Sequence, residues 1–173
     1  MRWSKLKKAL EDLLADVVKD HLDVHFTRYG RSPSSMMDRG WVTWDKEEIY
    51  NFSTVNWLRT NRSVATLMYE AGEREELPGW RDEEVLKRLE QAEITSRDQW
   101  YVALKTYPSL SIEQAVHSPH ALIRGWAMFD RRLGKRRLCS MEIKPTDPPF
   151  MNRWYQLRCR AEGIPAGSAG HDH

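Results

Sequence analysis

Basic side chains are concentrated at one place in the last third of this 173-residue chain. The cluster consists of Arg124 and of five further cations within residues 131–137, which are Arg131, Arg132, Lys135, Arg136 and Arg137. Guanidinium groups form paired, charge-assisted hydrogen bonds with carboxylates and phosphates. The cluster therefore predicts a surface that binds an acidic or phosphate-bearing partner. The competing interpretation is that these cations cap a helix and pair within the chain, with Asp130 or with an acidic segment.

The charges of the chain are unevenly spread, although its formal net charge is only +2. Residues 70–93 carry nine acids and four bases, whereas residues 118–160 carry ten bases and three acids. Such asymmetry is typical of proteins that bind phosphates or nucleic acids at one end. Nucleic-acid binding through the same basic surface is therefore an alternative, with interspersed Trp and Tyr side chains stacking on single-stranded bases. The favoured interpretation of the asymmetry is that the two segments attract each other within the fold or face water.

A second candidate site is enzymatic. Asp130 precedes Glu142-Ile143-Lys144 by twelve residues, which resembles the carboxylate and lysine spacing of magnesium-dependent nucleases. That chemistry needs adjacent strands, whereas Asp130 falls on a predicted helix. The sequence holds no nucleophile elbow, phosphate-binding glycine loop or dinucleotide fingerprint. We therefore predict a protein without catalytic residues, with the nuclease-like enzyme as an alternative.

The histidines do not have the spacing of metal ligands. His21 and His25 are separated by residues typical of a strand, and His171 and His173 lie in the terminal tail. No acidic partner accompanies them at ligand spacing, so no metal site and no cofactor are predicted. His117 and His120 flank the start of a central helix, where we expect them beside its cap.

Two segments 29 residues apart echo each other and position the basic cluster. Each begins with a residue that commonly caps helices, Ser118 or Asp147, and continues with a proline and a stripe of apolar residues. Each ends with arginines and a glycine. This order predicts helices over 119–133 and 148–162. Two copies fall short of the three that repeat proteins need. If the two helices pack side by side, their equivalent arginines line one face. The basic link between them is either a short helix or a strand.

The first third of the chain predicts a helix followed by three strands. Residues 3–20 have apolar residues at three- and four-residue spacing, with Ser4 as the cap. Alternation predicts a strand over 22–29, and residues 41–45 and 47–53 predict a hairpin around Asp45-Lys46.

The rest of the chain is predicted to be helical. Helices are expected over 54–71, over 81–93 with Asp82 as cap, and near 97–106 and 112–117 after Ser-x-x-Gln capping boxes. The fold class is therefore α+β, with an N-terminal helix and a three-stranded antiparallel sheet before a mostly helical C-terminal half.

We expect one domain over residues 1–163, made of a helix and sheet part (1–71) and a helical part (80–163). A flexible tail is expected over 164–173. The αβββα order of residues 3–71 resembles double-stranded-RNA-binding domains, but the lysine-rich start of their second helix is absent.

Composition favours a soluble globular protein, with 40% hydrophobic and 30% charged residues and eight Trp to build a core. Cys139 and Cys159 lack zinc-site spacing, which suits small buried side chains in a reducing cytoplasm. The N-terminus has no apolar signal region, and no apolar run approaches the ~20 residues that span a bilayer. We expect a cytoplasmic protein that does not bind membranes.

Four segments resemble an uncharacterised family of small bacterial cytoplasmic proteins: MRWSKLKK, GWVTWDKEEIYNFST, ALIRGWAMFDRRLGKRRL and LRCRAEGI. The family has no established activity, so the resemblance implies only a bacterial-type, intracellular, single-domain protein. Together these observations predict a non-enzymatic binding protein whose basic cluster engages a protein partner with an acidic surface.

Overall fold

The structure is a computed structural model that describes residues 2–28 and 38–165, and it confirms the α+β class. The first part comprises α1 (Trp3–Glu11), α2 (Asp16–Lys19), β1 (Leu22–Arg28), β2 (Asp38–Trp44) and β3 (Glu47–Ser53). The helices that follow are α3 (Thr54–Glu70), α4 (Glu83–Gln91), α5 (Arg97–Thr106), the 3-10 turn η1 (Tyr107–Ser109), α6 (Ile112–Val116), α7 (Ala121–Phe129), α8 (Lys135–Cys139) and α9 (Pro149–Ala161).

The three strands form an antiparallel meander in the order β1-β2-β3. Val24 pairs with Val42, which in turn pairs with Tyr50, so these side chains share one face of the sheet. Both turn residues of the second hairpin have positive φ, 51° at Asp45 and 71° at Lys46. This is the geometry of a type I′ turn, which matches the twist of antiparallel strands. The predicted hairpin is confirmed.

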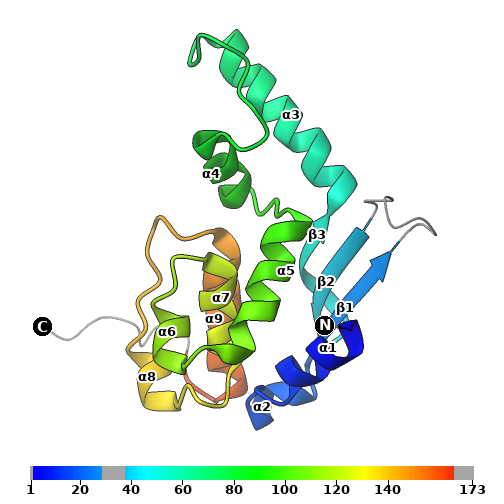
Figure 1. Cartoon of the computed structure of the whole chain (residues 1–173). Helices are drawn as coiled ribbons and strands as arrows, with labels where there is room; N and C mark the ends of the chain where they lie inside the picture. The colour runs from blue at the N-terminus through cyan, green and yellow to red at the C-terminus, as the bar shows by residue number, and fades with distance from the viewer. Residues whose placement is uncertain (1, 29–37, 166–173) are drawn as a thin grey trace, which may run out of the picture.

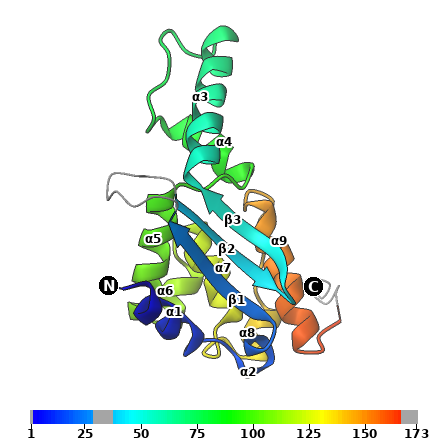
Figure 2. The ribbon, with the colours of Figure 1, turned by 90° about the vertical axis from the view of Figure 1, so that its right-hand side faces the viewer.

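Helices α5, α7 and α9 cover one face of the sheet (Figure 2). Their contact layer is aromatic: Tyr50 lies 6.0 Å from Trp100 and 5.6 Å from Trp154, measured between ring centroids. Helices α7 and α9 also pack on each other. Gly125 permits this approach, because a Cβ atom there would lie 2.9 Å from the Trp154 ring.

Helices α3 and α4 form an arm that rises away from the sheet and the helical layer (Figure 1). They pack on each other around a separate small core, whose buried residues are Ala65, Met68, Val85 and Leu89. In the αβββα arrangement of RNA-binding domains both helices lie on one face of the sheet, whereas α3 leaves the sheet after β3. The order of elements therefore matches that fold, but the packing of α3 does not.

The predicted helix over 3–20 is wrong in its middle, where it breaks into α1 and α2. Leu14 forms an isolated β-bridge with Asp130, and the Ala15 N–H donates to the Phe129 carbonyl at 2.9 Å. These tertiary hydrogen bonds replace the helical ones between the two pieces. The predicted cap at Ser4 is also wrong. Ser4 lies inside α1, and Arg2 is the N-cap residue.

The other helix signals have mixed outcomes. Both Ser-x-x-Gln capping boxes form, at Ser96 and at Ser111, and Asp82 caps α4. The helix predicted over 119–133 is shorter, because His120 is its N-cap in place of Ser118 and it ends at Phe129. The predicted start of the last helix is nearly right, but its N-cap is a proline and not Asp147.

Chain ends are only partly covered by the structure. Gly163 ends α9 with a positive φ of 68°, as its sequence position predicts. Ile164 packs against the core and its N–H donates to the Cys159 carbonyl at 2.9 Å, so the flexible tail does not begin there. Residues 166–173 of the expected tail, the strand residue Tyr29 and part of the loop before β2 lie outside the described residues.

Candidate basic binding surface

We call the six predicted cations the basic helix-end surface: Arg124, Arg131, Arg132, Lys135, Arg136 and Arg137. Arg124 lies within α7, two arginines lie in the turn after α7, and the other three cations lie on α8. The sequence allowed either a short helix or a strand for the basic link between the two echoing segments. The structure forms a short helix there, α8. Its Leu138 is fully buried while its cations are exposed, which turns Lys135, Arg136 and Arg137 towards solvent.

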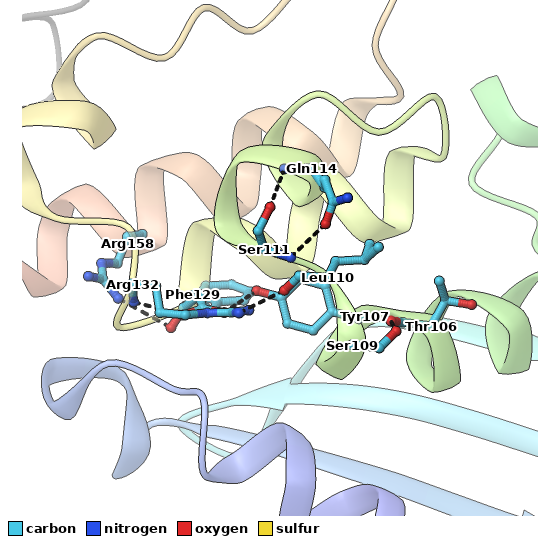
Figure 3. A network of polar contacts seen from close by, with 10 residues as sticks. Thr106, Tyr107, Ser109, Leu110, Ser111, Gln114, Phe129, Arg132 and Arg158 are labelled. Carbon is cyan, nitrogen blue, oxygen red and sulfur yellow. Dashed lines mark hydrogen bonds and ion pairs between the residues drawn. The ribbon is translucent and has the colours of Figure 1, made fainter.

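Arg132 is held by a buried carboxylate. Its Nη2 lies 2.7 Å and its Nε 3.1 Å from Asp130 Oδ2, and the Asp130 side chain is 0% exposed. Tyr107 donates its hydroxyl to the same carboxylate at 2.5 Å. Arg132 also donates to the Leu110 carbonyl at 2.7 Å, as Figure 3 shows. This network joins η1 to the end of α7, so Arg132 serves the fold.

The electrostatics of this network favour a charged pair beside a neutral phenol. Burial raises the pKa of Tyr107, and the charge of Asp130 and its hydrogen bond raise it further. The hydrogen bond to Asp130 raises the pKa of Arg132. The phenol therefore keeps its proton and acts as a hydrogen-bond donor to the carboxylate. Nothing in this arrangement leaves Asp130 free to act on a substrate.

Arg124 is also engaged inside the chain. Its Nη2 lies 2.5 Å from Asp147 Oδ1, and its Nη1 donates to the carbonyl oxygens of Ser118 and Pro119 at 2.8 and 3.1 Å. The two residues expected to be helix caps are therefore both bound by this arginine. Arg124 fastens the start of α7 to the start of α9.

Lys135 and Arg137 are exposed cations that pair with carboxylates, one with the largely buried Glu162 and the other with the exposed Glu113. Lys135 Nζ lies 3.2 Å from a Glu162 carboxylate oxygen and 2.8 Å from the Glu162 carbonyl, and Arg137 pairs with Glu113. Arg158 binds the same Glu162 at 2.7 Å but is buried, and it also donates to the Phe129 carbonyl at 3.3 Å. Its role went unpredicted, although the four-residue spacing between Arg158 and Glu162 is a recognisable ion-pair signal.

Two cations of the surface have no side-chain hydrogen bond or ion pair within residues 2–28 and 38–165. Arg131 nevertheless shares a hollow of about 580 Å³ with Glu11 and Asp12. Arg136 is exposed on α8 and is the freest of the six. Four cations of the surface are therefore paired within the chain. Arg131 and Arg136 are left without a side-chain partner in the described residues.

The echo between the two helices does not produce a row of free arginines. The helices do pack together, but Arg124 binds Asp147 and Arg153 binds Glu93 through two contacts of 2.7 Å. Glu93 belongs to the acidic segment 70–93, so the acidic and basic segments attract each other at this point. Most of the other paired acids in that segment bind arginines of their own arm.

A hollow of the described chain lies beside α8. It has a volume of about 670 Å³, within the range of ~300–1,000 Å³ typical of ligand sites. Its wall combines Leu133, Met141 and Ile143 with the cations Arg137 and Lys144. Glu142 and Asp147 add negative charge, but Asp147 is already bound to an arginine. The pocket therefore suits an anionic group attached to an apolar one.

The structure does not assemble the nuclease-like site. Asp130 is buried within the tyrosine and arginine network, whereas Glu142 and Lys144 are exposed in the irregular segment after α8. That segment forms no strand, so the two parts of the motif do not sit on adjacent strands. The spacing of these residues is a coincidence of sequence.

Within the described ranges no group of three His, Cys, Asp or Glu side chains could hold a metal ion. His21 binds Asp45 at 2.6 Å and His25 contacts the Thr43 hydroxyl at 3.1 Å, so the two imidazoles have different partners. His117 contacts the Glu113 carbonyl at 2.9 Å. His171 and His173 lie outside the described residues.

The two cysteines differ in exposure. Both are free thiols, but Cys139 is exposed on α8 while Cys159 is buried in α9, where burial raises its pKa. The prediction of two buried side chains is therefore wrong for Cys139, because Leu138 is the α8 residue that faces the core.

Comparison with known proteins places the chain in a family. The model of the SF0329 protein family matches residues 2–159. The chain belongs to the SF0329 protein family. The match spans the sheet, the arm and almost all of α9, and it includes the six cations of the basic helix-end surface. No curated protein and no solved structure matches the chain of this SF0329 protein. In the described residues, no helix has the length and apolarity to cross a membrane.

Proposed function

We propose that this SF0329 protein is a non-enzymatic cytoplasmic protein of bacterial type that binds an acidic or phosphate-bearing partner through the exposed part of the basic helix-end surface. The observation that carries the proposal is Arg136. It is exposed on α8 with no carboxylate partner in the described chain, next to Arg137 and its pocket. A free guanidinium at such a position offers two parallel hydrogen bonds to a carboxylate or phosphate.

The neighbouring exposed pairs support this assignment. Lys135 is 63% exposed and Arg137 is 46% exposed, and solvent-exposed ion pairs contribute only ~0–1 kcal/mol. A partner's carboxylate can therefore replace Glu113 on Arg137 at little cost, whereas Glu162 is 9% exposed and also binds the buried Arg158, so it stays with the fold. Arg124 and Arg132 are excluded from the contact surface, because their guanidinium groups already bind buried or half-buried groups of this chain.

The test is a titration with defined anionic probes, followed by fluorescence anisotropy. A labelled oligoglutamate peptide and a labelled polyphosphate represent the two partner classes. We expect binding that weakens at least about tenfold in the Arg136→Ala, Arg137→Ala double variant, since 1.4 kcal/mol corresponds to a factor of ten. The matched control is Arg59→Ala, Arg62→Ala, which removes two exposed, unpaired arginines of α3 and leaves binding unchanged.

Nucleic acid is a distinct outcome of the same experiment. Binding to a duplex weakens by orders of magnitude between low and moderate salt when many phosphates are contacted. If the protein binds oligonucleotides tightly with that salt dependence and does not bind the oligoglutamate peptide, its partner is a nucleic acid and not an acidic protein. Absence of binding to every probe at low salt would reject the proposed function.

A further inference from the structure

The arm formed by α3 and α4 carries most of the exposed apolar side chains of the described chain. Eight large apolar residues of that part are exposed, and six of them belong to the arm and its connecting loop: Val55, Leu58, Leu67, Tyr69, Leu77 and Trp80. Trp80 is 49% exposed although its ring lies 6.2 Å from Trp57. Exposed aromatic and aliphatic groups gathered on one projecting element are typical of a contact surface.

The same loop is strongly acidic. Residues 70–84 contain seven carboxylates and two arginines. Glu75 and Glu76 are exposed directly before Leu77 and have no partner in the described chain. The loop residues 71–82 therefore present an apolar anchor beside two free negative charges.

The pocket beside α8 has the complementary character. Leu133, Met141 and Ile143 provide apolar wall, while Arg137 and Lys144 provide positive charge, and Arg136 is free on the adjoining helix. Lys144 likewise has no side-chain partner in the described ranges. Apolar anchors that enter a pocket ringed by charged groups are the usual centre of a protein interface.

The two surfaces lie at opposite ends of the molecule. Figure 1 places the loop between α3 and α4 at the top and α8 at the bottom. One copy of the chain cannot join its own two ends without taking the fold apart, whereas the ends of two copies can meet.

We propose that loop 71–82 of one copy docks in the α8 pocket of a second copy, with Leu77 or Trp80 in the apolar part and Glu75 and Glu76 on the cations. This inference rests on the proposed function and names a second copy of the chain as its acidic partner. The contact is head-to-tail, so an open assembly keeps one free loop at one end and one free pocket at the other, and it grows as a filament unless a ring closes. Salt weakens the contact because its charges are exposed.

The test measures solution mass by sedimentation as concentration and salt are varied. The wild-type mass is expected to rise above the monomer value of 20.4 kDa with concentration at low salt, and to return to it at high salt. The loop variant Glu75→Lys, Glu76→Lys and the pocket variant Arg136→Glu, Lys144→Glu should each stay monomeric. Their equimolar mixture should associate again, because each mismatched surface then meets one of opposite charge.

A control variant, Asp20→Lys, Glu47→Lys, changes two exposed acids elsewhere by the same charge and should associate as the wild type does. The proposal is overturned if the wild type remains at 20.4 kDa at every concentration, if either charge-reversed variant still associates, or if the mixture does not. The loop variant separates this inference from the proposed function, since it should still bind oligoglutamate. Loss of self-association with retained peptide binding leaves the proposed function standing, whereas loss of peptide binding in the wild type removes it.

Discussion

The buried pair between Arg132 and Asp130 makes a prediction about stability that separates structural arginines from binding ones. Replacing Arg132 by Ala leaves the Asp130 carboxylate, which is 0% exposed, with only the Tyr107 hydroxyl and a backbone N–H as partners. An uncompensated buried charge costs about 3–5 kcal/mol. We expect the lower end, about 3 kcal/mol, because the guanidinium is 30% exposed and water screens the pair.

The assay is equilibrium unfolding in urea, with the thermal midpoint as a second probe. For a chain of this size a loss of about 3 kcal/mol lowers Tm by about 6–12 °C. The matched control is Arg136→Ala, which removes an exposed arginine whose side chain has no partner among the described residues and should change the free energy of unfolding by less than about 0.5 kcal/mol. The reasoning is refuted if Arg132→Ala unfolds at the wild-type midpoint, or if Arg136→Ala is the more destabilised variant.

Three further changes have expected outcomes that unfolding measurements can check. Gly125→Ala should destabilise the fold by about 1–3 kcal/mol, because its Cβ would lie 2.9 Å from the Trp154 ring. Lys46→Gly should stabilise it by about 1 kcal/mol, since a non-glycine residue at φ 71° is strained, whereas Lys46→Ala should bring no gain. Burial, aided by the charge of Arg124, lowers the pKa of His120 in the folded chain. As the pH falls through its usual pKa of ~6.5, the unfolded chain therefore binds a proton at His120 that the folded chain does not yet bind. Stability should therefore fall as the pH is lowered from 7 to 5, and less steeply in His120→Gln.

Each of these expectations has an outcome that contradicts it. Gly79 has open space around it, so Gly79→Ala should be tolerated, and equal losses at both glycines would argue against close packing of α7 on α9. An identical unfolding curve for the glycine and alanine variants of Lys46 would exclude strain at the turn. A pH profile that His120→Gln does not alter would assign the acid sensitivity to other groups.

Local signals in the sequence predict much of the fold. The Ser-x-x-Gln boxes at 96 and 111, the cap at Asp82 and the two-residue turn at Asp45-Lys46 depend on neighbouring residues alone, and all form as expected. The break after α1 was not predictable in this way. It depends on hydrogen bonds between Leu13–Ala15 and the end of α7, more than a hundred residues away. Local periodicity carries no information about such a contact.

The candidate site shows the same division. The sequence places the cations correctly near the end of α7, but it cannot say which of them meet carboxylates. Arg132 binds Asp130 two residues before it, a local pair that the sequence offered, whereas Glu113 lies on α6 and only the tertiary fold brings it to Arg137. The pair between Arg158 and Glu162 has a local signal in its four-residue spacing, but the contacts of Glu162 with Lys135 and of Arg158 with the Phe129 carbonyl depend on the tertiary fold.

The role of Arg136 and Arg137 is tested most directly by one measurement on one variant. Oligoglutamate affinity and the free energy of unfolding should both be determined for Arg136→Ala, Arg137→Ala. We predict that the affinity falls at least about tenfold while stability changes by less than about 1 kcal/mol, since the pair lost within the described residues is the exposed one between Arg137 and Glu113. Unchanged affinity, or unfolding of the variant, would contradict a binding role and assign these arginines to the fold.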